Sequence, residues 1–144
     1  MPSSYETFFD NQSFAVVGHS DKKPFPALTY GGLKNNGKKV FAVDPSADTV
    51  EGDPAYSDLE ALPEKVDAIV IEVPRAETRD WIEKAADAGI EHVWLHQTAD
   101  TPEAIALAKD RGLNVRYGTC AVQYVDGRFP HSIHKLIRKL LRRY

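Results

Sequence analysis

The sequence is poor in several features that mark whole classes of protein. Its single cysteine among 144 residues, Cys120, excludes an internal disulfide and a zinc site built from several cysteines. No apolar run approaches the roughly 20 residues that span a bilayer, and the first residues lack the pattern of a secretory signal. With 42% hydrophobic residues the composition is too apolar for a disordered chain. We therefore expect a single domain over residues 1–144, in a cytoplasmic setting and without a membrane partner.

Acidic residues are missing from one part of the chain. Residues 128–144 hold six of the 18 basic residues and no acid, so the other 127 residues carry 12 basic against 21 acidic residues. Apolar residues in this segment recur at helical spacing from Ile133 to Leu141, which predicts an amphipathic helix over about 130–142. Its basic face fits a solvated helix surface, and the acidic body makes nucleic acid an unexpected partner.

The rest of the chain alternates between short apolar runs and segments of helical spacing. Strands are expected at 14–17, 40–43, 68–73, 92–95 and 113–117, and helices at 3–9, 25–37, 76–88 and 101–112. A short helical turn is expected around Leu59 within an irregular, proline-containing stretch over 44–63, and a short extra strand at 120–125. Strands joined through helices form parallel sheets. The pattern predicts a three-layer α/β domain of Rossmann-like type, with five parallel strands and helices on both faces.

Ligands of such sheets bind at the carboxyl ends of the strands. Gly18 ends the first strand, where a glycine permits either a tight turn alone or the approach of a phosphate to backbone amides. The dinucleotide fingerprint G-x-G-x-x-G is absent, because Gly18 is followed by His19, Ser20, Asp21, Lys22 and Lys23. The hydroxyl of Ser20 and the ammonium groups of Lys22 and Lys23 could bind a phosphate. The two lysines could equally be a solvent-exposed pair without a ligand.

The second and third strands end in similar sequences. Asp44 stands where NAD-binding proteins place the acid that holds a ribose hydroxyl, which favours NAD. Pro45 and Pro74 instead offer two apolar ledges between which a flat base would fit, although both prolines would also simply end strands. On the residues alone, the alternatives are an NAD(H)-binding enzyme or redox sensor and a protein that binds another ligand with phosphate groups and a flat base.

Several blocks resemble the CoA-binding domain family. They are Phe14–Ser20, Val43-Asp44-Pro45, Gly52, Tyr56–Leu59, Leu62-Pro63, Val66-Asp67, Val73-Pro74-Arg75, Ala88–Ile90, Val93–Leu95, Gly112-Leu113 and Thr119-Cys120. Together they cover about residues 12–125 in order. The chain is similar to small stand-alone members of that family, and to the CoA-binding domain of the succinyl-CoA synthetase alpha subunit.

The resemblance implies a Rossmann-like fold that binds coenzyme A. It implies that Gly18, His19 and Ser20 lie at the phosphates, that Val43, Asp44 and Pro45 border adenine and ribose, and that Val73, Pro74 and Arg75 close the other side. The family commonly has asparagine at the position of Asp44, and often a lysine after the proline, where this sequence has Ser46. Phosphate charge would then be balanced by Lys22, Lys23, Arg75 or Arg79.

The residues give little sign of catalysis. No Ser-His-Asp set, Walker loop or pair of carboxylates of defined spacing is present, and His131 and His134 lack the further ligands that a metal site needs. His96 and Gln97 follow the fourth strand and could face the pantetheine arm. We expect His96 either to make a hydrogen bond or to lie in an exposed loop. The Cys120 side chain is either a small buried apolar group or a thiol that lies within reach of the CoA thiol. The sequence predicts ligand binding rather than turnover, with Tyr124 and Phe129 available either for a homodimer contact or for packing beneath the last helix.

Overall fold

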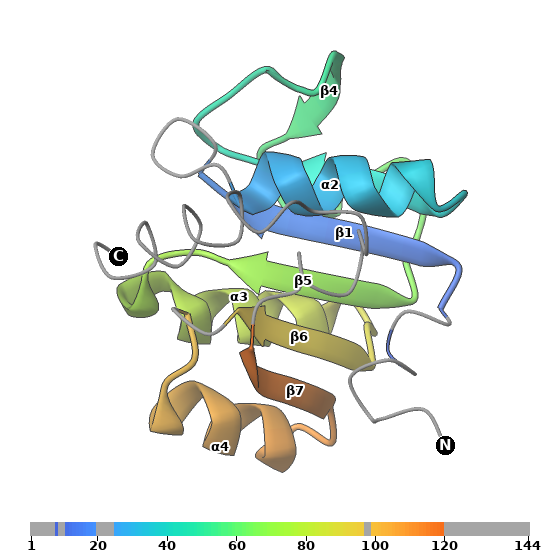
Figure 1. Cartoon of the computed structure of the whole chain (residues 1–144). Coiled ribbons are helices and arrows are strands. Elements are labelled where there is room, and N and C mark those ends of the chain that lie inside the picture. Colours follow the sequence, from blue (N-terminus) through green and yellow to red (C-terminus); the bar gives the residue numbers. More distant parts are fainter. Residues whose placement is uncertain (1–7, 9–10, 20–24, 97–98, 120–144) are drawn as a thin grey trace.

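The computed structural model describes residue 8 and residues 11–19, 25–96 and 99–119. Its elements, labelled in Figure 1, are β1 (Ser13–Gly18), α2 (Phe25–Asn35), β2 (Lys39–Val43), β3 (Thr49–Val50), β4 (Asp53–Tyr56), the 3-10 turn η1 (Leu59–Ala61), β5 (Ala68–Glu72), α3 (Arg75–Asp87), β6 (His92–His96), α4 (Pro102–Asp110) and β7 (Asn114–Thr119). The helices expected at 3–9 and 130–142 and the strand expected at 120–125 lie outside the described residues. In the described ranges no helix has the length and apolar character that crossing a membrane requires.

All five expected strands are present, but the expected strand number is wrong. In the part of the chain that is described the sheet has seven strands, in the order β3-β4-β2-β1-β5-β6-β7. Neighbouring strands from β4 to β7 pair in parallel, and β3 pairs antiparallel with β4. Both additional strands come from the stretch predicted to be irregular.

A tight hairpin turn creates the two additional strands. Val50 pairs with Asp53, and the two residues between them have positive φ angles, 52° at Glu51 and 82° at Gly52. Positive φ at both central residues is what a type I′ hairpin turn requires, and glycine adopts it without strain. Pro54 is tolerated because the Ala55 amide and not that of residue 54 bonds toward β3, and pairing with β2 begins only at Ala55.

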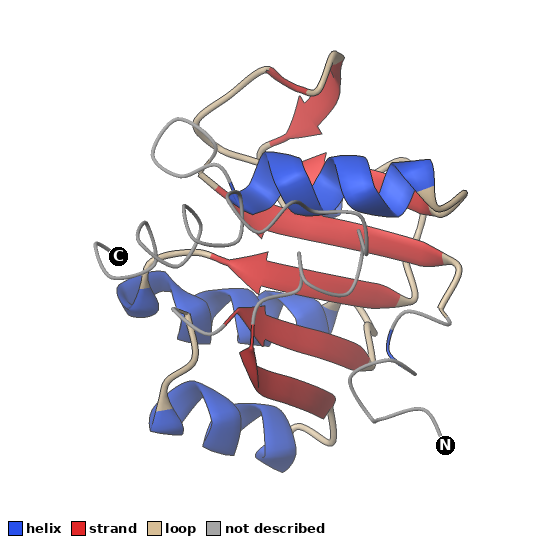
Figure 2. Cartoon of the chain, viewed as in Figure 1, coloured by secondary structure: helices blue, strands red, loops and turns tan. Residues whose placement is uncertain are grey.

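The sheet lies between two layers of helices, as predicted. Helices α3 and α4 cover one face and α2 covers the other, as Figures 1 and 2 show. Alternate strand residues pack against each layer: those facing α3 and α4 include Val17, Ile69, Ile71 and Val93. Phe14, Val16, Val70 and Trp94 face the opposite side, where Leu33 of α2 completes the cluster. Burial on both faces explains why these strands are nearly continuous apolar runs.

Local signals fix the helix boundaries. The Thr101 hydroxyl accepts a hydrogen bond from the Ala104 amide at 3.0 Å, and Pro102 is the first residue of α4. The expected turn around Leu59 is also confirmed. It begins at Asp58, whose side chain accepts a hydrogen bond from the Leu59 amide. Side-chain caps therefore fix where α4 and η1 begin.

Candidate functional site

The chain changes direction across the sheet between β1 and β5. From β1 it runs outward through β2 to β4, and then returns to β5 on the other side of β1. In open α/β sheets, ligands bind outside the carboxyl ends of the strands at such a point. The residues that follow β1, β2 and β5 are therefore the candidates for ligand binding.

Gly18 ends β1 where the start of α2 approaches closely. A Cβ atom at this position would lie 2.2 Å from Cγ of Pro26 and 3.0 Å from the carbonyl oxygen of Glu72. No side chain fits within these distances, so packing alone requires glycine here. The close approach brings the first turn of α2 against the ends of β1 and β5.

His19 connects the end of β1 to the start of α3. Its Nε2 atom lies 2.8 Å from Oε1 and 3.0 Å from Oε2 of Glu77, which belongs to the first turn of α3. The His19 side chain is 12% exposed and that of Glu77 39%. This contact joins two segments 58 positions apart and orients the imidazole across the point where the strand order reverses.

Asp44 stabilises the turn after β2. Its Oδ1 accepts hydrogen bonds from the backbone amide of Ser46 at 2.9 Å and from the Ser46 hydroxyl. The residue is only 2% exposed, whereas Pro45 is exposed. The carboxylate thus shapes the backbone turn, and the turn presents the ring of Pro45 at the surface.

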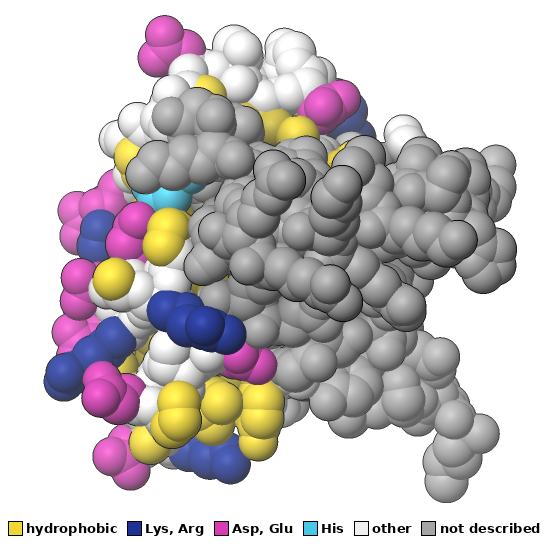
Figure 3. All heavy atoms as spheres, turned by 60° about the vertical axis from the view of Figure 1, so that its left-hand side comes forward, with side chains coloured by type: hydrophobic (Ala, Val, Ile, Leu, Met, Phe, Trp, Pro, Cys, Tyr) yellow, Lys and Arg dark blue, Asp and Glu magenta, His cyan; other side chains and the backbone are white. Residues whose placement is uncertain are grey.

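A hollow of about 480 Å³ lies beside these residues. It is lined by residues that follow β1, β2 and β4 and by one side of α3, namely His19, Pro45, Ser57, Glu77, Asp80, Trp81, Glu83, Lys84 and Asp87. Its volume is within the range of small-ligand sites. Figure 3 shows the side of the molecule on which acidic side chains gather along one margin, with basic ones between them. Two sequence-predicted residues, His19 and Pro45, therefore meet at one cavity.

The other predicted site residues have different positions. Val43 and Val73 are fully buried in the core that faces α3 and α4, so only their backbones can border a ligand. Pro74 directly precedes α3, half-buried, and Arg75 is the first residue of that helix and exposed. Four predicted residues lie outside the described part of the chain: Ser20, Lys22, Lys23 and Gln97.

Two buried polar residues end the central strands, and sequence reasoning missed one of them. Glu72 and His96 follow Val70 and Trp94 by two positions, so their side chains point to the α2 face. Both are fully buried. The Thr29 hydroxyl of α2 donates a hydrogen bond to Oε2 of Glu72 at 2.7 Å. Of the two alternatives for His96, the exposed loop position is wrong, because His96 is buried at the end of β6.

Burial shifts the pKa values of these two groups in opposite directions. It raises the pKa of the Glu72 carboxyl to about 8, against which the hydrogen bond from Thr29 acts. It lowers the pKa of the His96 imidazole to about 3. Since desolvation disfavours the charged form of each group, both side chains are predominantly neutral at pH 7. They add two uncharged polar groups beneath the carboxyl ends of β5 and β6.

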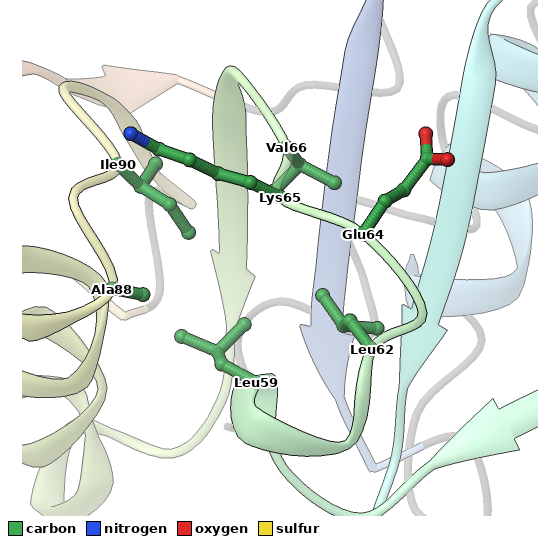
Figure 4. A pocket seen from close by; sticks show the side chains of 7 residues that line it. All are labelled: Leu59, Leu62, Glu64, Lys65, Val66, Ala88 and Ile90. Atoms are coloured by element: carbon green, nitrogen blue, oxygen red, sulfur yellow. The ribbon is translucent and has the colours of Figure 1, made fainter.

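A second, smaller cavity lies at the opposite edge of the sheet. It has a volume of about 260 Å³ and is lined by Leu59, Leu62, Glu64, Lys65, Val66, Ala88 and Ile90. Figure 4 shows that the aliphatic chain of Lys65 extends over toward Ile90 while Glu64 points away from it. Val66 and Ile90 precede β5 and β6, so the cavity lies at the amino ends of the strands, away from the site built by His19 and Pro45.

Comparison with known proteins shows the family of the chain and structures of similar fold. A family model described as a CoA binding domain matches residues 12–125. A conserved hypothetical protein from Pyrococcus furiosus is similar in structure, with a TM-score of 0.70 and 28% identity over 78% of this chain and 97% of that one. A hypothetical protein from Pyrococcus horikoshii gives a TM-score of 0.75 at 23% identity, over 85% and 89% of the two chains. An acetyl-coenzyme A synthetase of Ca. Korarchaeum cryptofilum gives 0.65 at 27% identity, over 78% of this chain and 27% of that one.

Proposed function

The chain belongs to the CoA-binding domain family, and on that premise we propose that it binds coenzyme A or an acyl-coenzyme A without turning it over. The match of the family model over residues 12–125 carries the proposal. It is supported by the hollow at the carboxyl ends of β1, β2 and β4, because this is the edge of the sheet where such folds hold nucleotides.

The positions of the residues suggest how the ligand lies. The adenosine end is expected beside Pro45, in the part of the hollow that follows β2. The diphosphate is expected at Gly18 and His19 and at the loop that follows them, which includes Ser20, Lys22 and Lys23. The amino end of α3 lies on the same side, and the helix dipole and the Arg75 side chain favour an anion there. The pantetheine arm would then pass the end of β5 toward Gln97.

The contacts of the polar groups at the hollow support binding rather than catalysis. The imidazole of His19 is held by the Glu77 carboxylate, and the carboxylate of Asp44 by the Ser46 amide. Both contacts fix the backbone on either side of the cavity. A general base needs to reach the proton that it abstracts from a substrate, and the Asp44 carboxylate, which is only 2% exposed and bonded within its own turn, is not placed to do so.

Thermal unfolding with added nucleotide tests the proposal. A ligand at 100 times its dissociation constant stabilises a folded protein by about 2.7 kcal/mol, so coenzyme A should raise the unfolding temperature clearly. NAD at the same concentration should raise it less. Equal or greater stabilisation by NAD would contradict binding of coenzyme A as the specific ligand.

A pair of proline variants tests where the ligand binds. Pro45→Glu places a carboxylate and a longer side chain in the hollow, and should remove the effect of coenzyme A without unfolding the protein. Pro63→Glu is the matched control, because Pro63 is also exposed but does not line the hollow. If both variants respond to coenzyme A like the unmodified protein, the ligand does not occupy the hollow.

A further inference from the structure

We propose that the amino ends of β5 and β6 form a binding site for a free apolar α-amino acid. Its side chain occupies the apolar hollow lined by Leu59 and Ile90, and its ammonium and carboxylate groups lie in a neighbouring polar hollow. The inference does not depend on the proposed function, because this site lies at the edge of the sheet opposite the one built by His19 and Pro45.

The lining of the apolar hollow suits a small aliphatic group. Figure 4 shows its side chains directed toward a common space between the turn η1 and the end of α3. Five of its seven lining residues are apolar, namely Leu59, Leu62, Val66, Ala88 and Ile90. Its volume of about 260 Å³ is below the roughly 300–1,000 Å³ of sites that hold drug-sized ligands. The hollow therefore fits a group of the size of an amino-acid side chain.

Lys65 borders both hollows and carries its charge to the polar one. Its aliphatic chain extends toward Ile90 (Figure 4), and its ammonium group lies over Gly89, where an added Cβ atom would be 3.0 Å from Nζ. In the part of the chain that the structure describes, Lys65 has no hydrogen-bond or ion-pair partner. Glu64 does not neutralise it, since the Glu64 carboxylate points away and lies 2.6 Å from Nζ of Lys39.

The polar hollow carries unpaired charges of both signs. It has a volume of about 170 Å³ and is lined by Asn11, Lys65, Val66, Asp67, Gly89, Glu91 and His92. The carboxylates of Asp67 and Glu91, like the Lys65 ammonium, have no ion-pair partner among the described residues. A ligand group with one charge would match one sign and face the other. The head of an amino acid, with an ammonium and a carboxylate, matches both.

A buried nitrogen of His92 also lacks a partner. His92 is the first residue of β6 and lines the polar hollow, and its Nδ1 atom is buried with no hydrogen-bond partner in the described ranges. Such atoms are rare in folded proteins, because burial without a hydrogen bond is costly. When Nε2 carries the imidazole proton, Nδ1 can accept a hydrogen bond. The ammonium group of an amino acid in the hollow supplies the donor.

Titration of the isotope-labelled full chain with L-leucine, followed by two-dimensional amide NMR spectra, tests the inference. The amides of Val66, Gly89 and Ile90 should shift in a saturable way, with a dissociation constant of about 1 mM for a ligand of this size. Isocaproate, which is leucine without its ammonium group, and isoamylamine, which is leucine without its carboxylate, should each bind about threefold more weakly, as expected for the loss of a partly exposed ion pair.

A pair of lysine variants tests the role of the Lys65 charge. Lys65→Met keeps the aliphatic chain and should weaken leucine about threefold, but should leave isoamylamine unchanged, because that compound has no carboxylate to pair with Lys65. Lys109→Met is the matched control, since Lys109 is also exposed and lines neither hollow. Equal leucine affinities of the two variants would contradict the assignment of the carboxylate to Lys65.

A pair of alanine variants tests the apolar hollow. Ala88→Gln fills part of it and should weaken leucine by about tenfold, whereas Ala61→Gln should not, because Ala61 is exposed and lines neither hollow. The amide spectra also show whether each variant is folded. The inference is overturned if leucine causes no saturable shift at roughly twenty times the expected dissociation constant, or if leucine, isocaproate and isoamylamine bind equally. Neither result bears on the binding of coenzyme A.

Discussion

The fully buried carboxyl group of Glu72 gives a quantitative prediction about stability. Its pKa is about 8 in the folded protein, against 4.5 as the ordinary value that we take for the unfolded chain. Between these values the folded state holds a proton that the unfolded state has released, so stability falls as the pH rises. At pH 7, 2.5 pH units above the unfolded pKa, the loss amounts to about 3 kcal/mol at about 1.4 kcal/mol per unit.

Replacing Glu72 with glutamine removes the titration and keeps the shape. The amide oxygen can still accept the hydrogen bond that Thr29 donates to Glu72 at 2.7 Å. Glu72→Gln should therefore stabilise the protein at pH 7 by about 3 kcal/mol, or roughly 10 °C in unfolding temperature for a domain of this size. Near pH 4.5 the difference should be close to zero.

Urea unfolding at half-unit steps from pH 4.5 to 8 measures this effect. The unmodified protein should lose about 1.4 kcal/mol per pH unit more than Glu72→Gln over this interval. Glu91→Gln is the matched control, since Glu91 is exposed and should follow the unmodified protein. If Glu72→Gln has the same pH dependence as the unmodified protein, the carboxyl group is ionised in the folded state and the reasoning fails.

Two further predictions concern the same edge of the sheet. The His96 imidazole has its pKa lowered to about 3 by burial, against an ordinary value of 6.5, so stability should fall by about 1.4 kcal/mol per unit as the pH drops below 6.5. In urea titrations, His96→Asn should reduce this loss of stability below pH 6.5. If the variant loses stability as steeply as the unmodified protein, groups other than His96 cause the loss. Gly18→Ala should destabilise the protein by about 1–3 kcal/mol, because the added Cβ overlaps Pro26; circular dichroism melting measures it, and an unchanged melting temperature would show that α2 can shift freely.

The main strands could be predicted because their signal is local. Phe14–Val17 and Ala68–Ile71 are apolar at every position, which is what strands buried on both faces require. The hairpin of β3 and β4 was missed because Pro45, Pro54 and Pro63 together suggested irregular structure. Its signal was present in the pair Glu51-Gly52, a two-residue turn between short β-forming segments.

The candidate site could be predicted only in part, for a physical reason. Gly18 ends β1, and Asp44 and Pro45 directly follow β2; topology alone brings such strand ends together. The contact of His19 with Glu77 joins residues 58 positions apart, and no periodic pattern encodes such a pair. Glu72 had a local signal, a charged residue inside an otherwise apolar strand, but its neutral state depends on burial beneath α2.

The β3–β4 hairpin also has a consequence for self-association. A long, flat strand at the rim of a sheet offers unpaired backbone groups to a strand of another molecule, which promotes aggregation. Here the rim next to β4 is formed by β3, which is only two residues long and is followed at once by the Glu51–Gly52 turn. Such a short rim leaves little room for an incoming strand to pair. The hairpin thus protects this margin of the sheet against edge-to-edge polymerisation.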